Sequence, residues 1–317
     1  MQRAVDAAPT TAGPAVSSWI QHRSAVISAY VALSALLAAL LGLPERPYVL
    51  IWAIGLVVLT CAGSERGIRR FLMDWLPVLV IAAGYDLVRS QAPDLLDRAI
   101  VQPQLRFDEI VFGGTAPTVW LQDRLVDSGT PHWWDYVALL FYLSHFVFTL
   151  SVAAVLYVKS RARFHRLAML ILTVSVAGFV TYFIVPAVPP WLASRYGDLP
   201  HTTRIVHDVW ADLGISGVAK VFHGDAELAN PVAALPSLHA AWPFMVLLLL
   251  WPKAGRWRWA LVGYNAMMIL TLVYGSEHYV SDILLGWLYA GVTFVVMNRI
   301  WDARERRAHA GSRPLRA

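Results

Sequence analysis

Long apolar runs separated by short connectors dominate the amino-acid sequence. Two of them, Ala25–Leu43 and Tyr136–Val158, are each long enough to cross a hydrocarbon core, which takes about 20 helical residues. Only 15% of the 317 residues are charged, against about a quarter in soluble domains. The alternating apolar pattern of a membrane barrel is absent, and helices satisfy their own backbone hydrogen bonds in lipid. We therefore predict an all-α fold, a polytopic integral membrane helical bundle.

Eight stretches of the chain are candidate membrane-spanning helices. The third is the weakest, because Asp74 and Asp86 flank or enter it. In chain order the eight cover about residues 26–43, 48–63, 75–90, 134–158, 166–186, 239–252, 258–274 and 279–299. Residues 91–133 mix charged and aromatic side chains, which predicts short helices in the membrane interface. Residues 187–235 are rich in Gly and Pro and predict a loop with a short helix near Ile205–Leu213.

The basic residues predict how the chain is oriented in the membrane. Of the 26 Lys and Arg residues, 18 fall in the two termini and in every other connector, and the other eight fall in or beside the alternate connectors. Because cytoplasmic connectors carry the excess of Lys and Arg, both termini are placed in the cytoplasm. Segments 91–133 and 187–238, with Gly275–Asp282, then face outward from a cell membrane. The abundance of Ala, Arg and Trp suggests a high-GC bacterial source.

Composition also argues against other classes of protein. The formal net charge of +5 reflects the short basic connectors, so we expect no nucleic-acid partner. The single cysteine, Cys61, lies within an apolar stretch, which excludes an intrachain disulfide and a cysteine-based metal site. The outer histidines His201, His207 and His223 lack metal-ligand spacing with an acidic partner, so we predict no metal.

The first motif with chemical potential is Pro236-Ser237-Leu238-His239, which opens an apolar helix. Ser237 is a favoured N-cap residue, and the free N–H groups and dipole of a helix start attract anions. His239 then lies in the first turn, beside any phosphate held there. The alternative, which this motif taken alone favours, is an ordinary capped helix start with an interfacial histidine.

The second motif is His278-Tyr279-Val280-Ser281-Asp282, which opens the last apolar helix. Residues four apart share one face of a helix, and a carboxylate that accepts from one imidazole nitrogen leaves the other as a nucleophile or base. An Asp at the start of a lipid-embedded helix is costly and is a functional candidate. The alternative is an interfacial Asp that snorkels or caps. Because the chain goes down one helix and returns by the next, His239 and His278 are predicted to face each other at one membrane boundary.

Together, Pro-Ser-x-His and His-Tyr-x-x-Asp on successive outward-facing helix starts resemble the type 2 phosphatidic acid phosphatase superfamily. Within it, Ala234–Ala241 and His278–Asp282 are most similar to the inositol phosphorylceramide synthase (inositolphosphotransferase) branch. The segments Pro189-Pro190-Trp191 and Phe112–Trp120 resemble bacterial members of that branch. The resemblance covers about residues 105–299 and implies a six-helix catalytic core, with the first two spans outside it.

On this basis we divide the chain into four regions. They are a disordered cytoplasmic tail (1–25), an N-terminal transmembrane hairpin (26–70), a catalytic membrane domain (71–300) and a basic cytoplasmic tail (301–317). The last region is expected to be disordered after Asp302, near anionic lipid headgroups.

The resemblance implies a role for each motif residue. His278 would attack phosphorus to form a phosphohistidine, and Asp282 would orient it and balance its charge. His239 would protonate the leaving oxygen and then deprotonate the incoming acceptor. General chemistry agrees, because a nucleophile, an acid–base group and an orienting carboxylate divide the transfer into two steps. No metal or other cofactor is needed.

The sequence departs from the phosphatase branch at its basic positions. Leu238 stands where that branch has Gly, Leu272 stands where it has Arg, and its Lys-x6-Arg-Pro motif is absent. The phosphate-binding candidates are therefore Ser237 and Leu238 at the helix start, with the outward basic residues Arg195, Arg204 and Lys220. For each basic residue, an exposed loop charge is an equally good interpretation. His145, inside the fourth span, either lines the substrate cavity or is a hydrogen-bonded core histidine.

We predict a membrane-embedded lipid phosphotransferase with its active site on the extracytoplasmic face. Its substrate is a lipid phosphate or phospholipid, and its acceptor is a lipid, a sugar or water. Two alternatives remain open. One is a hydrolase that releases phosphate from a lipid or polyprenyl phosphate, and the other is a non-catalytic lipid-binding or transport protein.

Overall fold

The computed structural model describes residues 29–30, 33, 65–127, 130–214 and 230–311. The chain divides into two compact units, residues 1–76 and 77–317, and the second holds most of the described residues. The predicted N-terminal tail and the predicted spans 26–43 and 48–63 lie outside the described residues, except that residues 29, 30 and 33 are helical.

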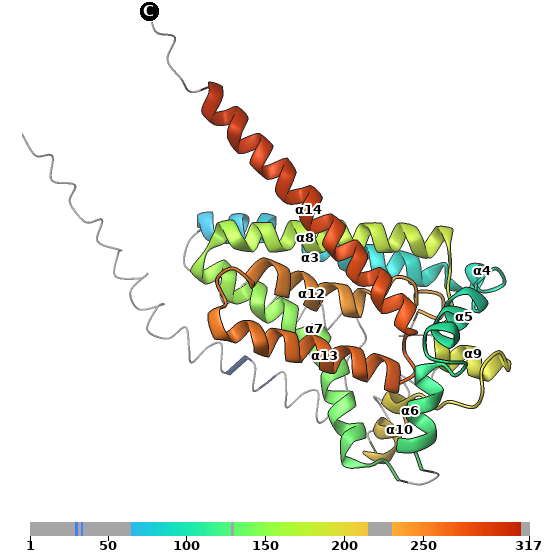
Figure 1. Ribbon diagram of the computed structural model, residues 1–317. Helices are drawn as coiled ribbons and strands as arrows, with labels where there is room; N and C mark the ends of the chain where they lie inside the picture. Colours follow the sequence, from blue (N-terminus) through green and yellow to red (C-terminus); the bar gives the residue numbers. More distant parts are fainter. Residues whose placement is uncertain (1–28, 31–32, 34–64, 128–129, 215–229, 312–317) are drawn as a thin grey trace, which may run out of the picture. The chain divides into compact units, whose positions relative to one another are not determined.

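The described residues form helices, as predicted, and apart from isolated bridges this part of the chain contains no strand. Figure 1 shows their order. The helices are α3 (Glu65–Ser90), α4 (Ala92–Leu96), α5 (Gln102–Val111), α6 (Pro117–Leu125), α7 (Trp133–Lys159), α8 (Arg161–Ile184), α9 (Pro190–Tyr196), α10 (Ile205–Asp212), α12 (Leu238–Leu250), α13 (Arg258–Tyr274) and α14 (Val280–Gly311), with a 3-10 turn η1 (Gly255–Trp257) before α13.

The long helices coincide with the predicted spans. By length and apolar composition, however, fewer helices than the predicted eight meet the standard for crossing a membrane. Among the described residues, α8 and the stretch Val280–Ala308 of α14 meet that standard by themselves. Helix α7 meets it when its halves Trp133–His145 and Val147–Lys159, bent by 43°, count as one span. Helix α3, which contains the weak third span, does not meet it. The total of eight spans stays a prediction.

The predicted disorder after Asp302 is wrong for residues 303–311. Helix α14 continues without a break to Gly311. The segment from Ala303 to Ala308 is rich in Ala, Arg and Glu, which are strong helix formers. An exposed ion pair between Arg166 and Glu305, with nitrogen and oxygen 3.1 Å apart, also links this extension to α8. Local propensity therefore carries the helix beyond its apolar part.

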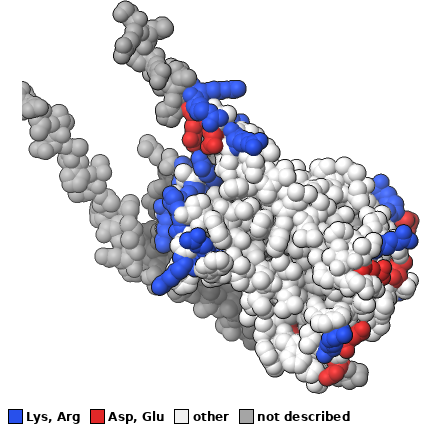
Figure 2. Space-filling view, viewed as in Figure 1, with Lys and Arg blue, Asp and Glu red and all other residues white. Residues whose placement is uncertain are grey.

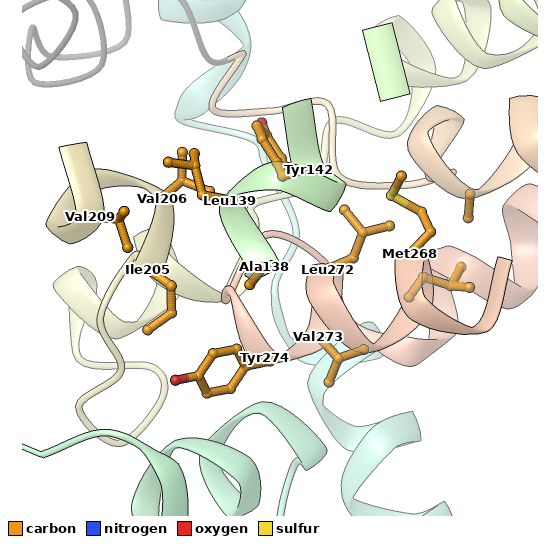
Figure 3. Packing of buried hydrophobic residues seen from close by; sticks show 12 residues of the cluster. Ala138, Leu139, Tyr142, Ile205, Val206, Val209, Met268, Leu272, Val273 and Tyr274 are labelled. Carbon is orange, nitrogen blue, oxygen red and sulfur yellow. The ribbon is translucent and has the colours of Figure 1, made fainter. Parts of the chain in front are cut away.

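The core of the second unit lies where α7, α10, α12, α13 and α14 meet, and Figure 3 shows part of it. Helix α12 packs against α7, α8, α13 and α14. Leu272 is fully buried in this cluster, so an arginine at this position would be surrounded by apolar side chains. The cluster comprises Ala138, Leu139, Tyr142, Ile205, Val206, Val209, Ala240, Met268, Leu272, Val273, Tyr274 and Ile283.

The short helices gather at one end of the bundle, where α14 begins (Figure 1). The predictions of short helices in 91–133 and of one near Ile205–Leu213 are confirmed by α4, α5, α6 and α10. Parallel bridges pair Ile100 with Ala187 and Ala187 with Ala233, so three segments distant in sequence are joined here. The backbone hydrogen bond from the Ile100 N–H to the Pro186 carbonyl is 2.9 Å long.

Helix α9 was not predicted, because Pro189 and Pro190 suggested a loop. Proline is nevertheless favourable in the first turn of a helix, where its missing N–H would have no partner. Pro190 begins α9, and Gly197, with φ of 84°, ends it in the left-handed conformation. The turn residues at both ends thus enclose a short helix.

The charged side chains lie at the two ends of the second unit. Figure 2 shows mainly Lys and Arg, with a few acidic side chains, at the end where α13 begins and α14 ends, and mixed charges at the opposite end, over the short helices. The face between them carries almost no charge. Large apolar side chains are exposed on the long helices, including Leu140, Val158, Ile184 and Leu288. Such a surface suits contact with lipid rather than water.

Candidate active site

The start of α12 is built as the sequence predicted. Ser237 has extended backbone angles and occupies the N-cap, where its hydroxyl oxygen accepts a hydrogen bond from the Ala240 N–H at 3.3 Å. Ser237 is fully buried. His239 follows in the first turn, half-buried. The Leu238 side chain points towards α8, because a Cβ at Gly178 would lie 3.0 Å from it.

The start of α14 differs from the prediction in one respect. The helix begins at Val280, so His278 lies in the preceding turn rather than on the helix. Asp282 reaches back over that turn, and its Oδ2 accepts a hydrogen bond from the Tyr279 N–H at 2.9 Å. The same oxygen lies 3.4 Å from Nδ1 of His278. The predicted proximity of the imidazole and the carboxylate is therefore present.

The structure brings the three predicted catalytic side chains together. Nε2 of His278 lies 3.4 Å from Nδ1 of His239, and Nδ1 of His278 faces Asp282. His278 is 4% exposed and Asp282 is fully buried. Charges buried in this way interact more strongly than they would in water. One ring nitrogen of His278 is thus oriented by a carboxylate, and the other faces a second imidazole.

A close approach of two backbones holds the motifs in register. The Ser237 N–H donates to the Asp282 carbonyl at 3.0 Å. One turn further along α14 is Gly286, where a Cβ would lie only 2.3 Å from the Ser237 carbonyl oxygen. Only glycine allows α12 to begin this close to α14. Sequence reasoning missed Gly286, although a glycine inside an apolar helix is itself a sign of close packing.

The turn before His278 is held by Ser276. Ser276 is fully buried and has a positive φ of 63°, which is uncommon for a residue with a side chain. Its carbonyl oxygen accepts from the Trp191 N–H at 3.0 Å, and its hydroxyl lies 3.0 Å from that of Thr202. Contacts from the segment between α8 and α10 thus fix a strained backbone next to the nucleophile candidate.

Arg204 lies near the histidine pair but is already paired. Its Nε donates to Oε1 of Glu277 at 2.7 Å and its Nη2 donates to Oε2 at 3.0 Å. Its guanidinium carbon is 4.7 Å from the centre of the Trp191 ring. Burial by itself lowers the pKa of Arg204, but the Glu277 carboxylate outweighs it, so the pKa lies above its ordinary value. Arg204 also interacts electrostatically with His239.

The other predicted basic residues are placed differently. Arg195 is exposed, with its guanidinium 5.2 Å from the centre of the Trp191 ring. Lys220 lies outside the described residues. Of the three basic candidates, Arg204 is therefore the one that the described part of the chain brings close to the histidine pair.

His145 belongs to the same cluster as His239. The centres of these two rings are 4.4 Å apart, and His145 is 4% exposed. Tyr142, one turn earlier on α7, stacks on His239 with ring centres 5.3 Å apart. Both interpretations of His145 made from the sequence place it in the bundle interior, and its position there is confirmed. Within the described residues, no group of three His, Cys, Asp or Glu side chains has metal-binding geometry.

Comparison with known proteins gives two relatives. The chain is 30% identical over 270 residues to a phosphoinositol dihydroceramide synthase from Bacteroides thetaiotaomicron, which covers 79% of this chain and 83% of that protein. It is 27% identical over 129 residues to the inositol phosphorylceramide synthase catalytic subunit aur1 from Schizosaccharomyces pombe, which covers 39% of this chain and 30% of that protein. No solved structure gives a significant match.

The two motifs also lie within a recognised family region. The family model described as PAP2 superfamily matches residues 114–296, more than half of the chain, and this stretch includes Ser237, His239, His278 and Asp282. The resemblance inferred from the motifs is thus confirmed by two kinds of comparison. By this match and its similarity to phosphoinositol ceramide synthases, the chain belongs to the PAP2 superfamily.

Proposed function

We propose that this protein is a membrane-embedded phosphotransferase that moves a phosphoryl or phospho-head group, such as phosphoinositol, on a lipid substrate through a phosphohistidine intermediate. The observation that carries the proposal is the contact of the His278 and His239 rings at 3.4 Å, with Asp282 behind His278. The relative from Bacteroides thetaiotaomicron, named for phosphoinositol and dihydroceramide, supports this choice of head group and acceptor.

In the first step, Nε2 of His278 attacks the phosphorus of the donor lipid. A nitrogen–phosphorus bond forms and the bond from phosphorus to the lipid oxygen breaks. His239 gives a proton to that oxygen, so the lipid leaves as a neutral alcohol. Asp282, whose Oδ2 lies 3.4 Å from Nδ1 of His278, balances the positive charge that the ring acquires. A phosphorus atom must displace the His239 contact to reach Nε2, so the two rings separate when the donor binds.

In the second step, the acceptor hydroxyl attacks the phosphohistidine. His239, which lost its proton in the first step, now takes the proton of that hydroxyl. The new oxygen–phosphorus bond forms, the nitrogen–phosphorus bond breaks, and both imidazoles return to their initial states. The product carries the head group on the acceptor lipid, and the cycle requires no metal ion.

The pairing of Arg204 supports a diester donor. A phosphate monoester carries a charge of about −1.5 to −2 at neutral pH, whereas a diester carries about −1. The positive charge of Arg204 is already balanced by Glu277. Among the described residues, the site has little uncompensated positive charge, which suits the donor with the smaller negative charge. This favours transfer of a phospho-head group over dephosphorylation of a lipid monoester.

We place this chemistry on the extracytoplasmic face of a cell membrane, in a bundle of eight spans with a six-helix catalytic core. The uncharged face in Figure 2 and the gathering of Lys and Arg at the end opposite the histidine pair support this orientation. The donor and acceptor lipids would enter from the outer leaflet, where α12 and α14 begin. Ser237, Leu238 and Arg204 are the phosphate-binding candidates beside the pair, and Arg195 and Lys220 remain candidates from the sequence.

The decisive experiment is to trap the intermediate on the full chain in proteoliposomes. Phosphatidylinositol labelled at phosphorus should label the protein on a histidine, and dihydroceramide should then remove the label into a new phospholipid. His278→Ala should form no labelled protein, and His239→Ala should abolish turnover. The control is His165→Ala, which should retain wild-type turnover, because His165 lies near the start of α8, at the end of that helix opposite to the histidine pair.

Each other outcome supports a different function. Release of the label into water without dependence on an acceptor would identify a hydrolase. Turnover that survives in His278→Ala would refute the phosphohistidine. A folded wild-type chain that binds these lipids and never becomes labelled would support the non-catalytic alternative.

A further inference from the structure

Asp108 is a buried acid that no sequence motif singled out. It lies on α5, within residues 91–133, and it is fully buried. Its Oδ2 accepts a hydrogen bond from the Val280 N–H at 2.8 Å, and its Oδ1 accepts one from the Ser281 N–H at 3.0 Å. One carboxylate thus holds two consecutive residues of α14 that lie more than 170 positions further along the chain.

These two N–H groups belong to the segment between His278 and Asp282. The first N–H groups of a helix have no acceptor within the helix itself. The Tyr279 N–H is taken by Oδ2 of Asp282 at 2.9 Å. Asp108 therefore completes, for Val280 and Ser281, the capping that Asp282 begins.

The removal of Asp108 would leave Asp282 as the nearby carboxylate that can accept from the Val280 and Ser281 N–H groups. Oδ2 of Asp282 already accepts from Tyr279 and lies 3.4 Å from Nδ1 of His278. Buried N–H groups that lose their acceptor turn to another one, because leaving them without a partner costs free energy. The carboxylate next to Val280 and Ser281 in the chain is Asp282. Each new hydrogen bond to Asp282 would draw it away from His278.

The ionised form of Asp108 is costly, which argues that it serves more than the fold. Desolvation by burial, with a contribution from the charge of Asp282, raises the pKa of Asp108 to about 6, although the hydrogen bonds from Val280 and Ser281 act in the opposite direction. A neutral asparagine in this place would avoid the buried charge, but its single amide oxygen could not replace both carboxylate oxygens that accept from Val280 and Ser281. Costly charges of this kind are concentrated at functional sites.

The rest of α5 fits the same picture. Gln104, one turn before Asp108, is 2% exposed. On the other side of the helix, Phe107 and Ile110 are exposed. Asp108 thus comes from the buried face of α5, which also carries Gln104 and Leu105, while Phe107 and Ile110 lie at the surface.

From this geometry we propose that Asp108 is a positioning residue, which fixes the start of α14 so that Asp282 stays on His278 during transfer. The inference rests on the proposed function, because it needs His278 to be the nucleophile. Asp108 contacts neither the phosphate nor the reacting nitrogen. Its loss should slow the chemical step and leave the affinity for the donor lipid largely unchanged.

The test compares Asp108→Ala and Asp108→Asn with wild type, as full chains in proteoliposomes of phosphatidylinositol and dihydroceramide. In Asp108→Ala, kcat and the single-turnover rate of histidine labelling should fall at least about 30-fold, while KM for phosphatidylinositol stays within about threefold. Asp108→Asn should recover about tenfold over alanine, because its amide oxygen still accepts a hydrogen bond. The control is Glu109→Gln, which removes the neighbouring charge of α5 and should stay within about twofold of wild type.

The outcomes separate this inference from the proposed function. Wild-type kcat in a folded Asp108→Ala chain, or a rise in KM with kcat unchanged, overturns the positioning role and leaves the phosphotransferase standing. An asparagine variant no better than alanine also overturns it, because hydrogen bonding would then not be the cause. If the alanine variant does not fold, Asp108→Asn decides: a kcat below about a third of wild type at unchanged KM supports the role, and wild-type kcat refutes it. Failure of wild type to label at all overturns the proposed function itself.

Discussion

Replacing Gly286 by alanine should separate the two motifs that form the site. A Cβ at this position would lie 2.3 Å from the Ser237 carbonyl oxygen, and such atoms do not approach within 3.0 Å in real structures. The start of α12 and the first turns of α14 must therefore move apart by at least 0.7 Å. The atom in the way belongs to the backbone, so no side chain can rotate to make room.

That displacement acts on the contacts that define the pocket. The hydrogen bond between the Ser237 N–H and the Asp282 carbonyl lies directly beside Gly286, and the His239 to His278 distance depends on the same helix pair. A misplacement near 1 Å costs up to about 100-fold in rate, so we expect kcat to fall about 10- to 100-fold, or ~1.4 to 2.7 kcal/mol of barrier. In Gly286→Ala, overpacking should cost about 1–3 kcal/mol of folding stability. The higher helix propensity of alanine should offset about 1 kcal/mol of that loss.

The assay is head-group transfer in proteoliposomes, with thermal unfolding measured on the same preparations. Gly291→Ala is the matched control, because it lies on the same helix and a Cβ there would meet nothing within 4 Å. The control should keep wild-type kcat and be equally stable or slightly more stable. Full activity in Gly286→Ala would refute the reasoning, since it would show that the register of α12 and α14 does not set the geometry of the pair.

Three further predictions concern the surroundings of the pair. Asp108→Asn should raise the unfolding temperature at pH 7. The pKa of Asp108 lies at about 6, above its ordinary 3.8, so ionisation of Asp108 destabilises the folded chain. The higher unfolding temperature of the variant should therefore vanish as pH falls towards 4, where the wild-type carboxyl is protonated. A gap in unfolding temperature that is independent of pH would contradict this. Glu277→Gln leaves Arg204 unbalanced and should raise kcat/KM for phosphatidic acid relative to phosphatidylinositol at least about threefold; an unchanged ratio counts against the charge argument. Ser276→Gly should be more stable than Ser276→Ala by about 1 kcal/mol in chemical unfolding. Both variants lose the hydroxyl contact with Thr202, but only alanine has an unfavourable conformation at a φ of 63°. Equal stabilities of the two variants would exclude backbone strain at this position.

The parts of the site that were predictable are those governed by local rules. A serine before an apolar run indicates an N-cap, and the Ser237 hydroxyl caps α12. Spacing along the chain placed His278 near Asp282, although the exact helix start at Val280 was beyond such a rule. Alternating membrane crossings predicted that His239 and His278 face each other, because the direction of each crossing follows from the order of the apolar runs, and their nitrogens lie 3.4 Å apart.

The residues that could not be predicted act across long sequence separations. Asp108 meets α14, and Arg204 meets Glu277, only after the two segments that carry the short helices have folded onto the bundle. Gly286 was visible as a glycine in an apolar helix, but its partner, the Ser237 carbonyl, was not. Among the basic candidates, sequence gave equal weight to Arg195 and Arg204, because charge alone does not tell which side chain the fold buries. Hydropathy and motif spacing do not show which distant segments of the chain contact each other, so contacts of this kind could not be predicted from them.

The charges around the histidine pair bear on which phosphate ester the site accepts. The N–H groups at the start of α14, which would otherwise attract an anion, are occupied by the carboxylates of Asp108 and Asp282. The charge of Arg204 is balanced by Glu277, and Leu272 lies in the apolar core where the phosphatase branch has arginine. A dianionic monoester would meet these carboxylates with little compensation, whereas a diester brings one charge fewer. Head-group transfer requires a diester donor, so the scarcity of unpaired basic side chains around the pair among the described residues agrees with transfer rather than with removal of a terminal phosphate.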